Sequence, residues 1–162
     1  MADVRSKRVP QHDKGGRWTK ISLDKLSPFD PTLYLDADTR VRESVAPLFE
    51  WVEAGWDMAM ALSSNQHGKD WLWHVSDAER QITARVVGPC IPQYQGGMMC
   101  FRKTEAVHRL FEAWRGEWAQ FEDQDQGAFM RALMFCPVKM WAVGSPWNGG
   151  TAIAHLFGRA RQ

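Results

Sequence analysis

The segment T32-L-Y-L-D-A-D-T-R40 decides the fold, because a short apolar run ends there in two aspartates separated by one alanine. The run Thr32–Leu35 holds β-branched, aromatic and aliphatic residues, which is typical of a covered β-strand. Such a strand ends in two carboxylates only where something stabilises their charge. Side chains two positions apart on a strand point the same way, so we expect Asp36 and Asp38 to face one point in space.

Helical patterns and apolar runs alternate along the rest of the chain. We predict helices over Trp18–Leu26, over 43–55, where Gly55 closes the helix, and over 126–135. Another helix is predicted from one buried stripe, formed by Val107, Leu110, Phe111, Trp114 and Trp118. Strands are predicted over 57–62, 96–101 and 138–143, and a polar, Trp-rich loop over a site at 63–76. Strands that alternate with helices are typical of an α/β domain.

Composition and charge narrow the class of protein. The chain has 162 residues, which predicts one domain over 17–162 after a polar, basic and flexible arm at 1–16. A net charge of +1 gives no broad field that would favour nucleic acid. No apolar run approaches ~20 residues, so we expect no membrane span. The polar N-terminus shows no signal peptide, and Cys90, Cys100 and Cys136 lack metal-ligand spacing, so we expect reduced cysteines and a cytoplasmic location.

Three chemistries use two aspartates at a strand end. A phosphatase-type aspartyl transferase needs a small residue or a hydroxyl at the position of Arg40, and a calcium loop is excluded by Arg40 and Val41. The third is a divalent cation that bridges the diphosphate of a nucleotide-sugar, where two carboxylates offset the charge of the ion. The alternative is a pair of solvated carboxylates at a turn.

Five further stretches bear on that choice. They are Thr19–Lys20, LYLDADT, QGGMMCFR, DQGAF and HLFGRAR, and they follow one another between about residues 18 and 162. In order and approximate spacing this series resembles the GT-A glycosyltransferases, especially their glycogenin-like, retaining group. The resemblance implies a GT-A fold, a mixed sheet flanked by helices, and transfer of a hexose from a nucleoside-diphosphate sugar.

The resemblance also implies a metal site and a donor site. His155 would be the third metal ligand beside Asp36 and Asp38, and imidazole beside two carboxylates suits Mn²⁺ better than Mg²⁺ or Ca²⁺. Gly158 would permit close approach of the backbone. Arg161 stands where the family has lysine and would bind the diphosphate bidentately.

Other positions would contact the sugar or the donor. Asp125 and Gln126 match the family pair that contacts the transferring sugar, although Asp123 with Gln126 also fits a helix capping box. The remaining donor contacts would be Lys20, Ala37, Gln95 (asparagine in the family), Gly96 and Gly97. A solvated helix lysine and a β-bulge at the glycines are the structural alternatives.

One departure from the family concerns the segment before Asp36. GT-A folds begin with a nucleotide-binding half, but only 35 residues precede Asp36, and the first 16 of them belong to the predicted flexible arm. One βαβ unit needs ~30 residues, so this half does not fit there. We therefore expect a truncated GT-A fold. Three explanations remain open: a fragment of a longer enzyme, a minimal enzyme whose nucleotide site is completed by a second copy or a partner chain, and a non-catalytic module that binds a nucleotide-sugar or carbohydrate.

Overall fold

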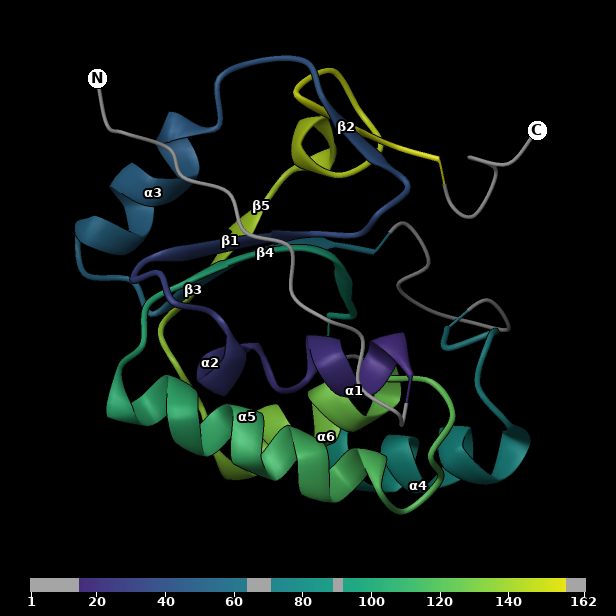
Figure 1. The fold of residues 1–162 in the computed structure, drawn as a ribbon. Coiled ribbons are helices and arrows are strands. Elements are labelled where there is room, and N and C mark those ends of the chain that lie inside the picture. The colour runs from purple at the N-terminus through teal and green to yellow at the C-terminus, as the bar shows by residue number, and fades with distance from the viewer. Residues whose placement is uncertain (1–14, 64–70, 89–91, 157–162) are drawn as a thin grey trace.

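Four strands form one mixed sheet in the middle of the molecule (Figure 1). The structure is a computed structural model, and it describes residues 15–63, 71–88 and 92–156. Their order is β1 (Thr32–Leu35), β4 (Tyr94–Phe101), β3 (Met58–Leu62) and β5 (Met140–Val143). β4 runs antiparallel to both of its neighbours, and β5 runs parallel to β3. β4 thus lies between β1 and β3, and β5 forms the edge of the sheet beside β3.

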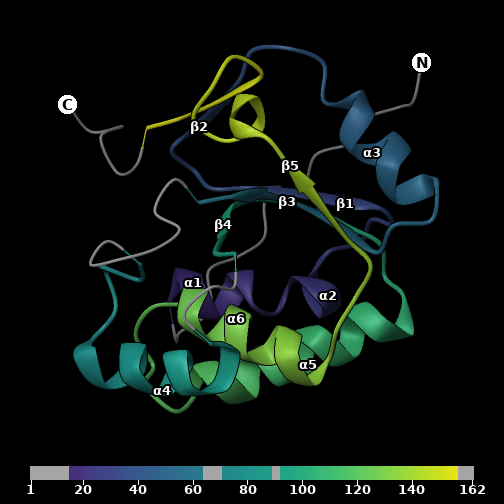
Figure 2. The ribbon, with the colours of Figure 1, turned by 180° about the vertical axis from the view of Figure 1, so that it is seen from behind.

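Helices cover both faces of this sheet (Figures 1 and 2). One face carries α1 (Gly16–Lys20), α2 (Leu23–Leu26), α5 (Glu105–Trp118) and α6 (Gln126–Phe135), with α4 (Asp77–Val87) packed against α6. The other face carries α3 (Ala46–Glu53), the 3-10 helix η2 (Ser145–Trp147) and a two-stranded ribbon of β2 (Thr39–Val41) and β6 (Ile153–His155). The prediction of an α/β domain with a mixed sheet flanked by helices is confirmed.

The stripe predicted on α5 forms the centre of the larger core. All five of its residues are buried: Val107, Leu110, Phe111, Trp114 and Trp118. Thr104 begins the helix, and its side chain accepts a hydrogen bond from the backbone N–H of Val107. A smaller core on the opposite face joins Leu48 and Val52 of α3 to the sheet. The sheet is therefore covered on both faces, which explains its continuous apolar strands.

The helix predicted over 18–26 is instead two short helices, α1 and α2. Ile21 and Leu23 are both buried, whereas Leu26 is 41% exposed. Residues two positions apart lie on opposite sides of one continuous helix, so a single helix could not bury Ile21 and Leu23 against the same neighbours. The break at Ile21 and Ser22 allows both side chains into the core.

Sequence analysis did not predict α4, β2 or β6. The buried side of α4 includes Glu79 and Thr83, so it lacks an apolar stripe. Its start did carry a signal, because Ser76 caps the helix by accepting from the backbone N–H of Glu79, as in a capping box. β2 and β6 have only three residues each and exist because they pair with one another.

The loop predicted at 63–76 lies partly outside the described residues. Its second part, 71–76, is a series of turns in which Trp71, Leu72 and Val75 pack with Met130 of α6. Trp73 in contrast is 63% exposed. Of the two tryptophans in this part of the loop, only Trp73 therefore presents most of its surface to solvent.

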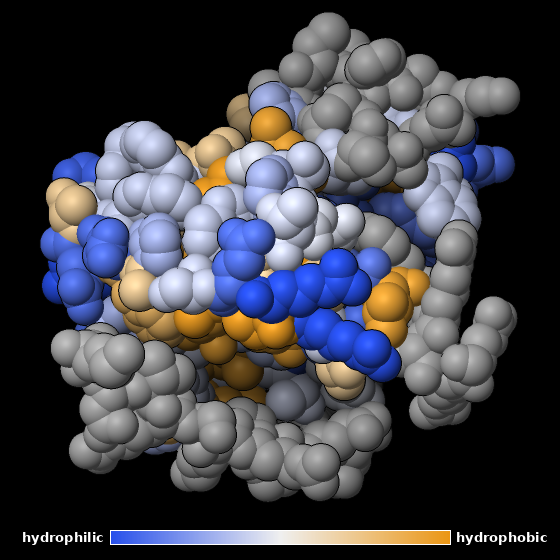
Figure 3. Space-filling view, turned by 90° about the horizontal axis from the view of Figure 1, so that it is seen from above, coloured by the Kyte–Doolittle hydropathy of each residue, from blue (hydrophilic) through white to orange (hydrophobic). Residues whose placement is uncertain are grey.

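No helix in the described part of the chain is long and apolar enough to cross a membrane. Figure 3 looks down on the side of the molecule that carries α3 and the β2–β6 ribbon. Hydrophilic side chains cover most of that side, and a narrow strip of apolar side chains shows between them.

Candidate metal centre

Asp36, Asp38 and His155 form a cluster in which one ligand atom from each residue lies within 4.8 Å of the other two. His155 Nε2 is 3.2 Å from Asp38 Oδ1 and 3.9 Å from Asp36 Oδ2. The three residues predicted as metal ligands are thus brought together by the fold, although Asp38 and His155 are more than 100 residues apart in the sequence.

The two aspartates converge through a turn and not through strand alternation. Asp36 directly follows β1, and Asp38 lies in the turn that leads to β2. The backbone N–H and the hydroxyl of Thr39 both donate to the carbonyl of Asp36, at 3.0 and 2.7 Å. His155 then arrives from β6, where it is the direct partner of Thr39. Asp36 and Asp38 therefore face one point, as predicted, but a turn brings them together and not the two-residue repeat of a strand.

Gly97 leaves the space that the His155 ring needs. A Cβ atom at position 97 would lie 2.3 Å from His155 Cε1 and 3.3 Å from Asp36 Oδ2. The pairing of β3 with β4 also shifts register between Met60 and Ala61, opposite this part of β4. The strand pairing is therefore irregular at the glycines, as the alternative of a bulge predicted, and this irregularity lies beside the cluster.

The second oxygen of Asp36 has donors of its own. Tyr34 Oη donates to Asp36 Oδ1 at 2.6 Å, and Lys20 Nζ lies 3.2 Å from the same oxygen. Burial, together with the charge and hydrogen bond of Asp36, holds the pKa of Tyr34 above its usual range, so the phenol stays a donor. This arrangement leaves Oδ2 of Asp36 directed at His155.

Lys20 joins Asp36 to Asp125. Its Nζ is 3.1 Å from Asp125 Oδ2. Burial alone would lower the pKa of Lys20, but the charges of Asp125 and Asp36 outweigh it and raise that pKa. Burial alone would raise the pKa of Asp125, and the charge of Lys20 outweighs it and lowers that pKa. Both groups are therefore charged at neutral pH, and Lys20 is not a solvated surface lysine.

The capping alternative for this segment is wrong. Asp125, and not Asp123, is the residue that begins α6, and its side chain makes no capping hydrogen bond. Trp114 Nε1 holds the turn by donating to the carbonyl of Asp125 at 2.7 Å, while the carboxylate points to Lys20. The carboxylate of Asp125 therefore pairs with Lys20 and does not cap α6.

Gln126 is used within the protein. Its Nε2 donates to the backbone carbonyl of Tyr94 in β4. A cavity of about 10 Å³ lies against Asp125, Gln126, Tyr94 and Gly96, and this is space for one water molecule at most. This cavity is too small for a hexose.

The remaining predicted donor contacts differ in how far the structure places them. Ala37 is exposed in the turn between the two aspartates, and Gln95 pairs with Ala61 of β3, two positions before Gly97. A Cβ at position 96 would lie 3.6 Å from Lys20 Nζ, so Gly96 borders the charge pair. Gly158 and Arg161 lie outside the described residues.

Sequence analysis missed two residues that contact the cluster. Tyr34 stands two positions before Asp36, and the period of a strand could have indicated that both side chains share a face. Asn148 follows η2, and its Oδ1 is 2.7 Å from His155 Nδ1. No spacing rule links an asparagine in a Gly-rich loop to a histidine seven residues later.

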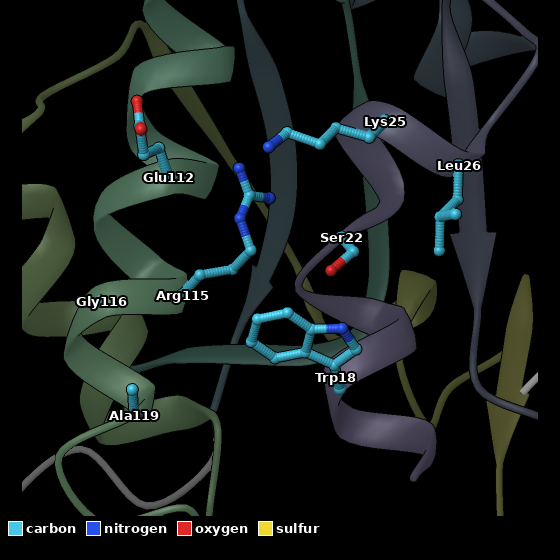
Figure 4. Close-up of a pocket in the computed structure, with 8 residues that line it drawn as sticks. All are labelled: Trp18, Ser22, Lys25, Leu26, Glu112, Arg115, Gly116 and Ala119. Atoms are coloured by element: carbon cyan, nitrogen blue, oxygen red, sulfur yellow. The ribbon is translucent and has the colours of Figure 1, made fainter. Parts of the chain in front are cut away.

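A larger hollow lies elsewhere, between α1–α2 and α5 (Figure 4). It measures about 510 Å³ and is lined mainly by carbon, with Trp18 and Leu26 on one side and Gly116 and Ala119 on the other. Its Arg115 is already bound to Asp24 at 2.6 Å. Ser22, Lys25 and Glu112 also line the hollow.

The cluster could hold a metal ion, because each of its three side chains offers one acceptor atom and these atoms lie within 4.8 Å of one another. Comparison of the chain with protein-family models and with curated proteins found no match.

Proposed function

We propose that this protein is a metal-dependent glycosyltransferase of truncated GT-A type, which transfers a hexose from a nucleoside-diphosphate sugar to an acceptor. The observation that carries the proposal is the convergence of Asp36, Asp38 and His155 within 4.8 Å. Two of these residues come from the strand-end motif and the third from a distant part of the chain, as the resemblance implies.

The charges around the cluster would balance once a divalent ion is bound. Asp36 and Asp38 offset a divalent ion, while Lys20 offsets Asp125 beside them. A bound cation would act as a Lewis acid on the leaving diphosphate. Asp36 would bind the cation through Oδ2, because Tyr34 and Lys20 occupy Oδ1.

The remaining roles come from the resemblance. Asp125 and Gln126 would orient the sugar, which requires the Lys20–Asp125 pair to open, since the cavity there is about 10 Å³. Arg161 would bind the diphosphate, and a second copy or a partner chain would complete the nucleotide site.

The small cavity favours one alternative function. If the Lys20–Asp125 pair stays closed, the chain would hold a metal and a nucleotide-sugar or carbohydrate without acting on it. Purified protein that binds Mn²⁺ and a nucleoside diphosphate, but does not hydrolyse or transfer from any nucleoside-diphosphate hexose, would favour this binding module.

Thermal unfolding tests the metal site first. Saturating Mn²⁺ should raise the melting temperature relative to chelator, because a cation that binds only the folded state stabilises it by mass action, by about 2.7 kcal/mol at one hundred times Kd. Asp38→Asn should reduce this increase, whereas Asp77→Asn, which changes an exposed aspartate on α4, should leave it unchanged. Equal melting temperatures of the wild-type protein with Mn²⁺ and with chelator would contradict both the metal site and the proposed metal-dependent activity.

A further inference from the structure

We propose that Asn148 is a positioning residue, which fixes His155 as the Nδ1–H tautomer and thereby presents Nε2 to a cation. The inference rests on the proposed metal site and extends it by one residue. Metal-binding histidines commonly donate their second N–H to an oxygen, and that bond sets both the tautomer and the orientation of the ring.

The geometry assigns the proton. Asn148 Oδ1 lies 2.7 Å from His155 Nδ1, and an amide oxygen accepts hydrogen bonds but does not donate them. Nδ1 must therefore carry a hydrogen, and in a neutral imidazole this is the only ring N–H. Nε2 then has a lone pair, and it faces Asp38 Oδ1 at 3.2 Å and Asp36 Oδ2 at 3.9 Å.

The ring is also held in place by packing. The His155 side chain is only 5% exposed. Gly97 leaves no side chain beneath the ring, and the ring occupies the space that a Cβ would need. A ring turned over would place carbon where Nδ1 now meets Asn148 and where Nε2 now faces Asp38, so both contacts favour the present orientation.

The backbone at Asn148 does not depend on its side chain. Its φ of −154° and ψ of 92° are extended values that any residue adopts. The surrounding loop is held by backbone bonds from Asn148 N to Ser145 O at 3.1 Å and from Gly149 N to Ile153 O at 2.9 Å. Substitutions at position 148 should therefore remove the side-chain bond without unfolding the loop.

A competing arrangement is a doubly protonated His155, which would donate to Asn148 through Nδ1 and to Asp38 through Nε2. Such an imidazolium would satisfy the same distances without a metal. The two arrangements differ in the proton on Nε2, which nitrogen-15 NMR of labelled histidines measures directly.

The test is carried out on metal-free protein at about pH 8.5. The His155 signal, assigned with His155→Gln, should show hydrogen on Nδ1 alone. Asn148→Leu should shift the hydrogen to Nε2 or give a mixture of tautomers, whereas Asn148→Asp keeps an acceptor and should restore Nδ1–H. A wild-type His155 with hydrogen on Nε2, alone or together with Nδ1, overturns the proposal.

Binding of Mn²⁺ alone, followed by electron paramagnetic resonance, supplies the second measurement. Asn148→Leu should weaken binding about 10–100-fold, the usual loss when the partner of a ligating histidine is removed. Asn148→Asp should bind at least as tightly as wild type. Equal affinity of Asn148→Leu and wild type overturns the positioning role. Wild-type protein with Nδ1–H but no affinity for Mn²⁺ contradicts the proposed function and leaves the tautomer assignment standing.

Discussion

Among single residues, Gly96 and Gly97 form a matched pair for testing the cluster. A Cβ at position 97 would overlap His155, while a Cβ at position 96 would lie at ordinary contact distance from Lys20 and Asp125. Gly97→Ala should displace the ring, cost about 1–3 kcal/mol as overpacking does, and abolish the stabilisation by Mn²⁺. Gly96→Ala should retain the wild-type stability and the stabilisation by Mn²⁺. Thermal scans of the two variants with and without Mn²⁺ measure this, and two variants that behave alike would show that the ring does not depend on Gly97.

Lys20→Met should destabilise the fold, because it removes the ammonium group that pairs with the carboxylates of Asp36 and Asp125. Removing one partner of a buried pair costs about 3–5 kcal/mol. The exposed Lys25→Met is the control and should cost little. Urea unfolding of both variants near neutral pH measures the difference.

The pH dependence of this variant has a definite sign. In the wild type, Lys20 lowers the pKa of Asp125, so this contribution is present above the ordinary pKa of about 3.8 and is lost as the pH falls through the lower, folded-state value. In Lys20→Met, burial raises that pKa instead, and protonation then relieves the variant. The stability difference between wild type and variant should shrink as the pH falls from neutral towards about 4. A difference that stays constant would show that Lys20 acts through packing alone.

The sequence predicted which residues form the cluster better than it predicted the residues that contact it. Asp36 and Asp38 stand in a recognisable motif, and His155 follows from the resemblance. The contacts made by Tyr34 and Asn148 depend on where side chains point in three dimensions. Asp125 was assigned two competing roles, and only the structure shows its carboxylate directed at a lysine from another helix.

Among the elements, Arg131 ties α6 to α4 and α5. The side chain is 1% exposed, and it contacts Glu79 Oε1 at 3.2 Å, Thr83 Oγ1 at 2.6 Å and Glu117 Oε2 at 2.7 Å. Burial raises the pKa of Glu79, and the hydrogen bond and charge of Arg131 oppose that rise. The guanidinium is therefore the counter-charge for a buried carboxylate.

Arg131→Met should destabilise the fold by about 3–5 kcal/mol, since it leaves Glu79 buried and unpaired. Arg131→Met with Glu79→Gln should recover part of that loss. The matched control is Arg109→Met on α5, whose pair with Glu105 is exposed and is worth at most about 0.5 kcal/mol. Chemical denaturation gives all three values, and an Arg131→Met protein as stable as the Arg109→Met control would show that the buried network contributes no net stability.

Elements with strong local patterns were predictable, and elements defined by their partners were not. α5 carries an uninterrupted apolar stripe, and α6 has the predicted bounds. α4 instead buries Glu79, which only Arg131 from another helix makes acceptable. β2 and β6 are short because the long-range pairing, and not local propensity, creates them.

For the whole molecule, the described chain before β1 holds only α1 and α2, and no strand. A nucleotide-binding βαβ half is therefore absent from the residues that the structure describes before the metal cluster. Discrimination among bases needs hydrogen-bonding groups that go unpaired with the wrong base. Trp73, at 63% exposure, could stack on a base, but stacking accepts any of them.

We therefore expect UDP, GDP and ADP to bind weakly, and within about tenfold of one another, or ~1.4 kcal/mol. Calorimetric titration of the three diphosphates in Mn²⁺ measures this, with His155→Gln as the control for binding through the metal. A preference of about one hundredfold or more for one base would reveal a base pocket and would contradict the truncated fold.

The β2–β6 ribbon has a consequence for the order of folding. It joins segments more than 100 residues apart, and contacts of such long range form late, after the entropy of closing the intervening chain has been lost. The cation site is complete only when this ribbon is closed. An ion that binds there should consequently leave the refolding rate almost unchanged and slow unfolding instead, because it stabilises contacts that are absent from the transition state. A bound metal ion would then stabilise the ribbon after the rest of the protein has folded. Loss of the ion would first separate β2 from β6, while the central sheet stays intact.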